Sequence, residues 1–159
     1  MNFLSDTTAP AHPALIEAIG AANAGFAASY GADEISSRVE ARLKTIFETD
    51  LKLLFAVSGT ASNALALSAL CPAHGAILCH DEAHIHRDER GAPEFFTGGA
   101  KLIPLAGAHA KISLEALDRA LGEIPEGFVH SSPARVLSLS NLTESGTAYT
   151  PAEVAEQAD

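Results

Sequence analysis

The chain has 159 residues, enough for a domain with its own core, and 47% of them are apolar while 19% are charged. This composition is typical of a globular protein and excludes an intrinsically disordered one. The net charge of −10 argues against a nucleic-acid partner and against an anionic membrane surface, because both are bound by lysine and arginine.

The first residues contain no basic segment followed by an apolar run, so we expect no secretory leader. No apolar stretch approaches the ~20 residues that a membrane span needs. Cys71 and Cys79 stand in apolar surroundings. We therefore expect two buried thiols in a cytoplasmic protein.

Helix and strand patterns alternate along the chain, which predicts an α/β fold with a mostly parallel sheet. Pro13 fits the first turn of a helix, and apolar residues at helical spacing predict a second helix over residues 33–47. In chain order we then predict a buried strand over 51–57, a helix over 61–70, a strand over 76–79, a small helix before the glycine pair at 98–99, a strand over 101–105, a helix over 113–122 and a strand over 135–139.

The end of the sequence predicts the start of one more helix. Thr150, Pro151 and Glu153 have the spacing of a capping box with a proline in the first turn. The sequence stops a few residues later, and so short a helix is marginal alone. We interpret the chain as a truncated portion of a larger domain.

Parallel sheets bind ligands beyond the carboxyl ends of their strands, so we expect functional residues after positions 57, 79 and 139. Ser58, Gly59 and Thr60 lie at the first of these places, where a strand is predicted to turn into a helix. Glycine lets the backbone approach a ligand, and the free N–H groups of a helix N-terminus favour an anion such as phosphate. The alternative is that the three residues make only a turn and a cap.

Residues 79–89 are rich in side chains that bind metals. His84, His86 and Asp88 alternate in a pattern similar to the metal-binding run of metallo-β-lactamase-like hydrolases, and zinc favours such ligands. The pattern lacks its next members, and only two histidines follow downstream. We expect no metal site and keep a zinc hydrolase as a remote alternative.

Several segments, in collinear order, resemble threonine aldolases of the bacterial low-specificity type, in the β-eliminating lyase family. They are residues 3–10, 29–34, 58–65, 82–84, 91–101 and 137–147, and the similarity covers essentially the whole chain. The resemblance implies that residues 1–159 are the N-terminal part of the large domain of a fold-type-I, aminotransferase-like enzyme. Such a domain has a mostly parallel sheet with helices on both faces and binds pyridoxal 5'-phosphate.

The resemblance also implies roles for individual residues. Ser58, Gly59 and Thr60 would bind the cofactor phosphate, and the His84 ring would stack on the cofactor's pyridine. His84, directly or through a water, would take the proton of the substrate β-hydroxyl. His130 would be a second catalytic histidine near the substrate.

Three further residues follow from the same resemblance. Ser5 would contact the substrate carboxylate, and Tyr30 would reach a site shared between subunits. Glu89 matches a family glutamate to which we assign no role.

The activity implied is retro-aldol cleavage of L-threonine or L-allo-threonine to glycine and an aldehyde, in a homodimer or homotetramer. In the family, the Schiff-base lysine and the aspartate that pairs with the pyridinium nitrogen lie downstream of residue 159. We interpret Lys44, Lys52, Lys101 and Lys111 as solvated side chains that match no Schiff-base motif.

The chain alone is therefore expected to be inactive, with the lysine supplied by the remainder of the polypeptide or by a second chain. The alternative is a non-catalytic fragment that binds pyridoxal phosphate or a partner.

Overall fold

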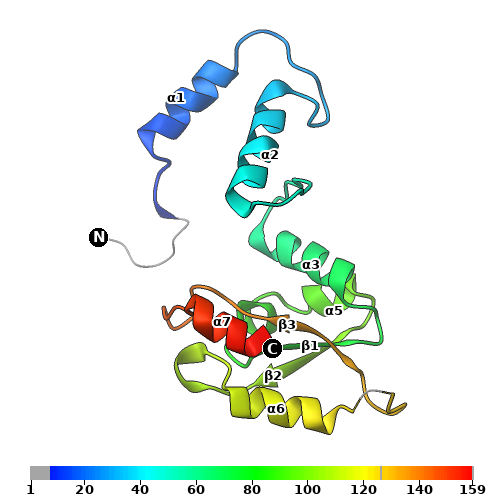
Figure 1. The fold of residues 1–159 in the computed structure, drawn as a ribbon. Coiled ribbons are helices and arrows are strands. Elements are labelled where there is room, and N and C mark those ends of the chain that lie inside the picture. The colour runs from blue at the N-terminus through cyan, green and yellow to red at the C-terminus, as the bar shows by residue number, and fades with distance from the viewer. Residues whose placement is uncertain (1–7, 126, 159) are drawn as a thin grey trace. The chain divides into compact units, whose positions relative to one another are not determined.

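The structure, a computed structural model, describes residues 8–125 and 127–158. The chain divides into two compact units, Met1–Leu54 and Phe55–Asp159 (Figure 1). The first unit contains α1 (Pro13–Ala22) and α2 (Glu34–Phe47). The second contains α3 (Gly59–Leu70), β1 (Ala76–His80), α4 (His84–Arg87), α5 (Ala92–Phe96), β2 (Lys101–Leu105), the 3₁₀ helix η2 (Ala108–Ala110), α6 (Leu114–Glu123), β3 (Ala134–Ser138) and α7 (Pro151–Ala158).

Local hydrogen bonds start the two helices of the first unit where the sequence predicts them. The His12 side chain accepts from the N–H of Ala14, and Pro13 occupies the first turn of α1. The Asp33 carboxylate caps α2 by accepting from the N–H of Ser36 at 2.8 Å. Neither helix contains a buried residue.

The sheet in the second unit has three strands in the order β2-β1-β3, and both pairings are parallel. This confirms the predicted parallel α/β fold. His80, Leu105 and Ser138 end their strands at one side of the sheet, which we call the carboxyl edge. The opposite side, where the strands begin, is the amino edge.

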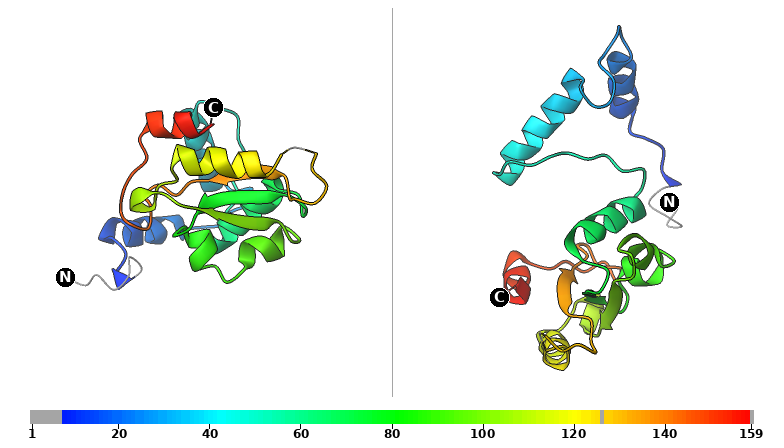
Figure 2. Two further views of the ribbon diagram at one scale, coloured as in Figure 1. Left: turned by 90° about the horizontal axis from the view of Figure 1, so that it is seen from below. Right: turned by 90° about the vertical axis from the view of Figure 1, so that its right-hand side faces the viewer.

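The central strand β1 is buried along its whole length, because helices cover both faces of the sheet (Figure 2). Ile77 and Cys79 pack with Leu67 of α3 on one face. Leu78 packs with Leu117 of α6 on the other face. Helices on both faces are thus confirmed.

Both cysteines are free and buried, as the sequence predicts. Burial raises the pKa of the Cys79 thiol to about 11. A thiol with such a pKa stays protonated at neutral pH, which suits a packing role.

The strand predicted over residues 51–57 is wrong. This segment has no regular structure, and the side chains of Leu54, Phe55 and Val57 are largely exposed. A strand needs a neighbour to complete its backbone hydrogen bonds. Both sides of β1 are already taken by β2 and β3, and within residues 8–125 and 127–158 no strand lies beside 51–57.

The capping box at the start of α7 is confirmed. The N–H of Thr150 donates to Oε2 of Glu153 at 2.7 Å, and the N–H of Glu153 donates to Oγ1 of Thr150 at 3.2 Å. In the part of the chain that the structure describes, no helix has the length and apolar character needed to cross a membrane.

Candidate functional site

The carboxyl edge of the sheet carries most of the polar side chains that the sequence singles out. A small hollow there lies between the segment after β1 and the segment after β3. Its polar lining includes His80, Glu82, Ser138, Ser140, Glu144 and Tyr149. Residues after positions 79 and 139 therefore meet at one place, as parallel strands require.

The N-terminus of α3 has the features of an anion site. Oγ of Ser58 caps the helix by accepting from the N–H of Ala61 at 3.2 Å. Among the described residues, no acceptor bonds the N–H groups of Gly59 or Thr60. Open space surrounds Gly59, with no atom within 4 Å of the place where a Cβ would stand.

These features fit the phosphate of pyridoxal phosphate. Two free amides and the Thr60 hydroxyl lie at the positive end of the helix dipole, where phosphate binds well. The Ser58 hydroxyl already serves the cap. Among the described residues, the backbone N–H groups of Gly59 and Thr60 are thus without an acceptor, and the role of Ser58, Gly59 and Thr60 as phosphate ligands stays a prediction.

His84 begins α4, a short helix that the sequence did not predict, and its side chain is held by a buried carboxylate. Nδ1 of His84 lies 3.0 Å from Oε1 of Glu89. The same oxygen accepts from Nδ2 of Asn63 at 2.7 Å. The Glu89 side chain is fully buried, whereas 48% of the His84 side chain is exposed.

The hydrogen bond with Glu89 raises the pKa of His84, and partial burial opposes this shift. The negative charges of Glu89, Glu144 and Asp88 add to the increase. Glu144 comes from the segment after β3, so both segments at the carboxyl edge act on this imidazole. Sequence reasoning did not find the contribution of Asn63, because its partner lies far along the chain.

The structure does not bring His130 to His84. His130 precedes β3 and so lies at the amino edge, where its ring meets that of Phe128 edge-on at 5.5 Å between centroids. His84 follows β1 and lies at the carboxyl edge. This placement gives no support to the catalytic role predicted for His130.

The two predicted substrate-binding residues belong to the first unit. Tyr30 lies between α1 and α2 with a positive φ of 60°, and its side chain is fully exposed. Ser5 lies outside the described residues.

The geometry of the described residues gives the zinc alternative no support. His84 and His86 are two residues apart on a helix and project from different sides, so they cannot share an ion with Asp88. Nδ1 of His84 is also engaged by Glu89. Within the described residues, no three potential ligands gather in a group that could hold a metal.

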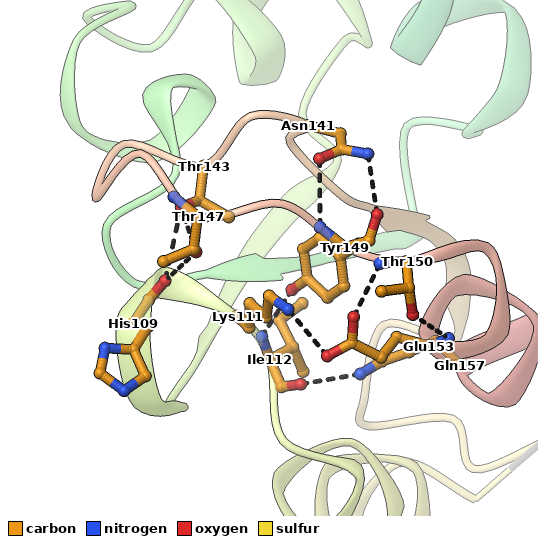
Figure 3. Close-up of polar contacts among 10 residues, drawn as sticks. All are labelled: His109, Lys111, Ile112, Asn141, Thr143, Thr147, Tyr149, Thr150, Glu153 and Gln157. Atoms are coloured by element: carbon orange, nitrogen blue, oxygen red, sulfur yellow. Dashed lines mark hydrogen bonds and ion pairs between the residues drawn. The ribbon is translucent and has the colours of Figure 1, made fainter.

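The prediction that all four lysines are solvated is wrong for Lys111. Its Nζ lies 2.7 Å from Oε1 of Glu153 and 5.3 Å from the centroid of the Tyr149 ring, and 24% of its side chain is exposed (Figure 3). The Lys111 side chain is only partly exposed because α7, which carries Glu153, packs beside the segment that follows β2. Lys44 and Lys52 are also paired, with acidic residues of the first unit.

A network around Tyr149 anchors the segment that follows β3 (Figure 3). The Tyr149 hydroxyl accepts from the buried N–H of Ile112 at 2.7 Å. The Asn141 side chain donates to the carbonyl of Tyr149 and accepts from its N–H. Oγ1 of Thr147 donates to the carbonyl of His109 at 2.7 Å. These contacts fix one wall of the hollow at the carboxyl edge.

Fold and site together define an α/β protein with a candidate anion-binding turn and a carboxylate-held histidine. Comparison with known families agrees with this class, because the beta-eliminating lyase family matches residues 2–159. The chain belongs to the beta-eliminating lyase family.

Two curated relatives are low specificity L-threonine aldolases. The one from Pseudomonas aeruginosa is 37% identical over 154 residues, and the one from Pseudomonas sp. is 34% identical over 153 residues. Each alignment covers 96% of this chain and 44% of the relative. The chain thus spans less than half the length of the curated relatives it matches.

A solved structure of threonine aldolase from Leishmania major has the same fold. The TM-score is 0.87 at 24% identity, and the match covers 98% of this chain and 45% of that one. This similarity confirms the predicted α/β architecture, a parallel sheet with helices.

Proposed function

We propose that this chain forms the first part of a pyridoxal-phosphate-dependent aldolase that cleaves L-threonine or L-allo-threonine to glycine and an aldehyde. The names of the two Pseudomonas relatives support the reaction class. The observation that carries the proposal for this chain is the arrangement in the second unit. A helix N-terminus with free amides at Gly59 and Thr60 is tied, through Asn63 and Glu89, to the histidine predicted to stack on the cofactor.

Different residues of this chain contact the phosphate and the pyridine ring of the cofactor. Gly59 and Thr60 bind the phosphate through backbone N–H groups and a hydroxyl, beside Ser58. The His84 ring stacks on the pyridine and fixes its plane. When bound, pyridoxal phosphate supplies an electron sink for the bond that breaks at the substrate α-carbon.

His84 is also placed to move a proton. Its half-exposed side chain lies at the carboxyl edge, and no described residue bonds Nε2. We propose that this nitrogen, directly or through one water, accepts the proton of the substrate β-hydroxyl. Ser5 and Tyr30 remain proposed contacts to the substrate carboxylate and to a subunit-shared site. His130, at the amino edge, stays a prediction as a second catalytic histidine.

The covalent anchor must come from elsewhere in the complete enzyme. In the second unit, Lys101 starts β2 at the amino edge, and Lys111 is paired with Glu153. We propose that the lysine and the pyridinium-pairing aspartate belong to the remainder of the subunit, within a cytoplasmic homodimer or homotetramer. The 159 residues alone are then inactive.

A chimera tests the proposal. It joins these 159 residues to the part of the P. aeruginosa aldolase that lies beyond the matched region. We expect the chimera to bind pyridoxal phosphate and to release acetaldehyde from L-threonine. A folded chimera that lacks cofactor binding, or that cleaves no β-hydroxy amino acid, would contradict the proposal.

The second candidate is a non-catalytic fragment that binds the cofactor without a covalent bond. The engagement of Lys111 favours it for the isolated chain. Equilibrium dialysis of the 159-residue chain against pyridoxal phosphate, followed by borohydride reduction and peptide mapping, tests it. Binding without a labelled lysine supports this candidate, whereas a specifically labelled lysine contradicts it.

A further inference from the structure

Side chains from two helices, α3 and α4, form hydrogen bonds with the buried carboxylate of Glu89. It lies between α4 and α5, and its side chain is fully buried although the histidine that it holds is half-exposed. Oε1 accepts two hydrogen bonds, from Asn63 at 2.7 Å and from His84 at 3.0 Å. Oε2 has no donor among the described residues. A carboxylate buried at such cost needs an explanation, because burial without full pairing is unfavourable.

The double hydrogen bond decides which nitrogen of His84 carries the proton. A carboxylate oxygen only accepts, so Nδ1 must be the donor. In the neutral ring the lone pair then lies on Nε2. That nitrogen is the one left unbonded within the described residues, so the free position of the ring is an acceptor.

Asn63 connects this pair to the anion turn. It lies on α3, one helical turn beyond Gly59 and Thr60. Glu89 therefore ties the position of the His84 ring to the helix whose N-terminus is the candidate phosphate site.

We propose that Glu89, braced by Asn63, is a positioning residue that fixes the ring orientation and tautomer of His84 and stabilises the imidazolium formed when Nε2 takes a proton. The catalytic half of this inference rests on the proposed function. The tautomer and the orientation do not. The logic is that of the buried aspartate of a serine protease triad, which acts through its histidine and stays ionised.

The electrostatic surroundings of His84 support the assignment. The groups that act on it are Glu89, Glu144 from the segment after β3, and Asp88 at the end of α4. All three are acidic, and together they raise the pKa of the imidazole. The Glu89 hydrogen bond is the largest cause, which makes Asp88 a natural control.

The first test uses the 159-residue chain without cofactor. ¹⁵N-histidine NMR, with His84 assigned by its loss in His84→Gln, measures the tautomer and the pKa. We expect the Nδ1–H tautomer in the parent protein. We expect Glu89→Gln to lower the His84 pKa more than Asp88→Asn does, with circular dichroism confirming that both variants fold.

Two results would overturn the inference. One is an Nε2–H tautomer in the parent protein, a measurement that requires no variant to fold. The other is an equal pKa change in Glu89→Gln and Asp88→Asn. Neither depends on aldolase activity, so the inference can fail while the proposed function stands.

The second test uses the chimera described above. We expect Glu89→Gln to lower kcat by about tenfold or more with KM little changed, since a positioned base contributes on this scale. The acid limb of the kcat/KM profile should move to lower pH, because the pKa of the base falls. A loss of folded protein alone would leave that limb in place, and an active variant with an unmoved limb would count against the inference. An inactive parent chimera would defeat the proposed function and leave the NMR result intact.

Discussion

At the scale of single residues, buried polar groups decide how the carboxyl edge is held. Glu89 fixes a side chain and Tyr149 satisfies a backbone N–H, and both do so from positions with under one tenth of the residue exposed. The bond from Ile112 to Tyr149 spans 37 residues, and the bond from Asn63 to Glu89 spans 26 residues. The removal of one partner therefore leaves a buried donor or acceptor without its bond.

The Tyr149 hydroxyl offers a direct measurement of this effect. In Tyr149→Phe the buried N–H of Ile112 loses its acceptor, and we expect a loss of about 1–3 kcal/mol in the free energy of unfolding. The other tyrosine, Tyr30, is fully exposed, so Tyr30→Phe is the matched control and should change stability little. Urea unfolding measures both, and equal effects would show that the hydroxyl of Tyr149 is not needed.

Thr60→Val tests the anion turn in the chimera. The substitution keeps the shape of the side chain and removes the hydroxyl proposed to bind phosphate. A hydrogen bond to a charged group contributes about 1.5–3 kcal/mol, so pyridoxal phosphate should bind roughly 10- to 100-fold more weakly. Thr45→Val, on α2, removes a hydroxyl that bonds only its own helix and is the control. An unchanged dissociation constant for Thr60→Val would count against this hydroxyl as a phosphate ligand.

At the scale of elements, α7 is held by its own capping box and by Lys111. Glu153 takes part in both, and the bond with Lys111 is the largest cause that lowers its pKa from 4.5 to about 2. Because the folded-state pKa is depressed, the stabilisation is complete above pH 4.5. It is lost as pH falls toward 2.

Glu153→Gln should therefore destabilise the chain at neutral pH, and its difference from the parent should shrink between pH 4.5 and 2. Glu156, on the same helix, is exposed and forms no ion pair among the described residues, so Glu156→Gln is the matched control and should change stability little at neutral pH. Urea unfolding at a series of pH values measures both. A difference between Glu153→Gln and the parent that is constant across this range would contradict the role of the ionised carboxylate.

The turn between β2 and η2 depends on one glycine. A Cβ on Gly107 would overlap the backbone carbonyl of Lys111, so the backbone itself would have to shift. We expect Gly107→Ala to destabilise the chain by about 1–3 kcal/mol, as overpacking does. Gly122→Ala, in α6, meets nothing within 4 Å and should be neutral or stabilising by up to ~1 kcal/mol. Thermal unfolding of the two variants measures the difference. Similar melting temperatures for Gly107→Ala and Gly122→Ala would refute the steric argument.

At the scale of the whole molecule, the two units differ in how much they bury. β1 is buried throughout, whereas α1 and α2 contain no buried residue. Helices of this length without a packed face are marginal in water. The sheet unit should therefore hold the stable part of the chain.

Hydrogen exchange tests this difference. We expect the amides of β1 to exchange at rates that reflect global unfolding, and those of α1 to exchange close to the rate of an unstructured peptide. Mass spectrometry of peptic peptides resolves the two segments. Protection of α1 equal to that of β1 would contradict the expectation.

Much of the fold was predictable because its determinants are local. Asp33, Ser113 and Thr150 each start a helix by a bond to a residue three positions on, a pattern visible in sequence. The strand over 51–57 was predicted wrongly because an apolar run shows burial preference but not whether a partner strand is present.

The candidate site was predictable only in part. His84 follows from its position after β1 and from family resemblance, whereas the anion turn follows from its helix start and from the same resemblance, because the strand expected before it is absent. The role of Glu89 was not predictable, because its bond to Asn63 spans 26 residues. The edge on which His130 lies depends on the direction of β3 in the sheet.

The amino-acid sequence by itself determined the helix starts, the central strand, the parallel α/β class and the family, since caps, buried runs and collinear motifs are short-range properties of a chain. Only the tertiary structure decided which side chains meet. Lys111 pairs with Glu153 across 42 residues, and Asn63 donates to the buried Glu89 across 26 residues. Such contacts depend on how the chain returns to the same edge of the sheet, and no local pattern records that return.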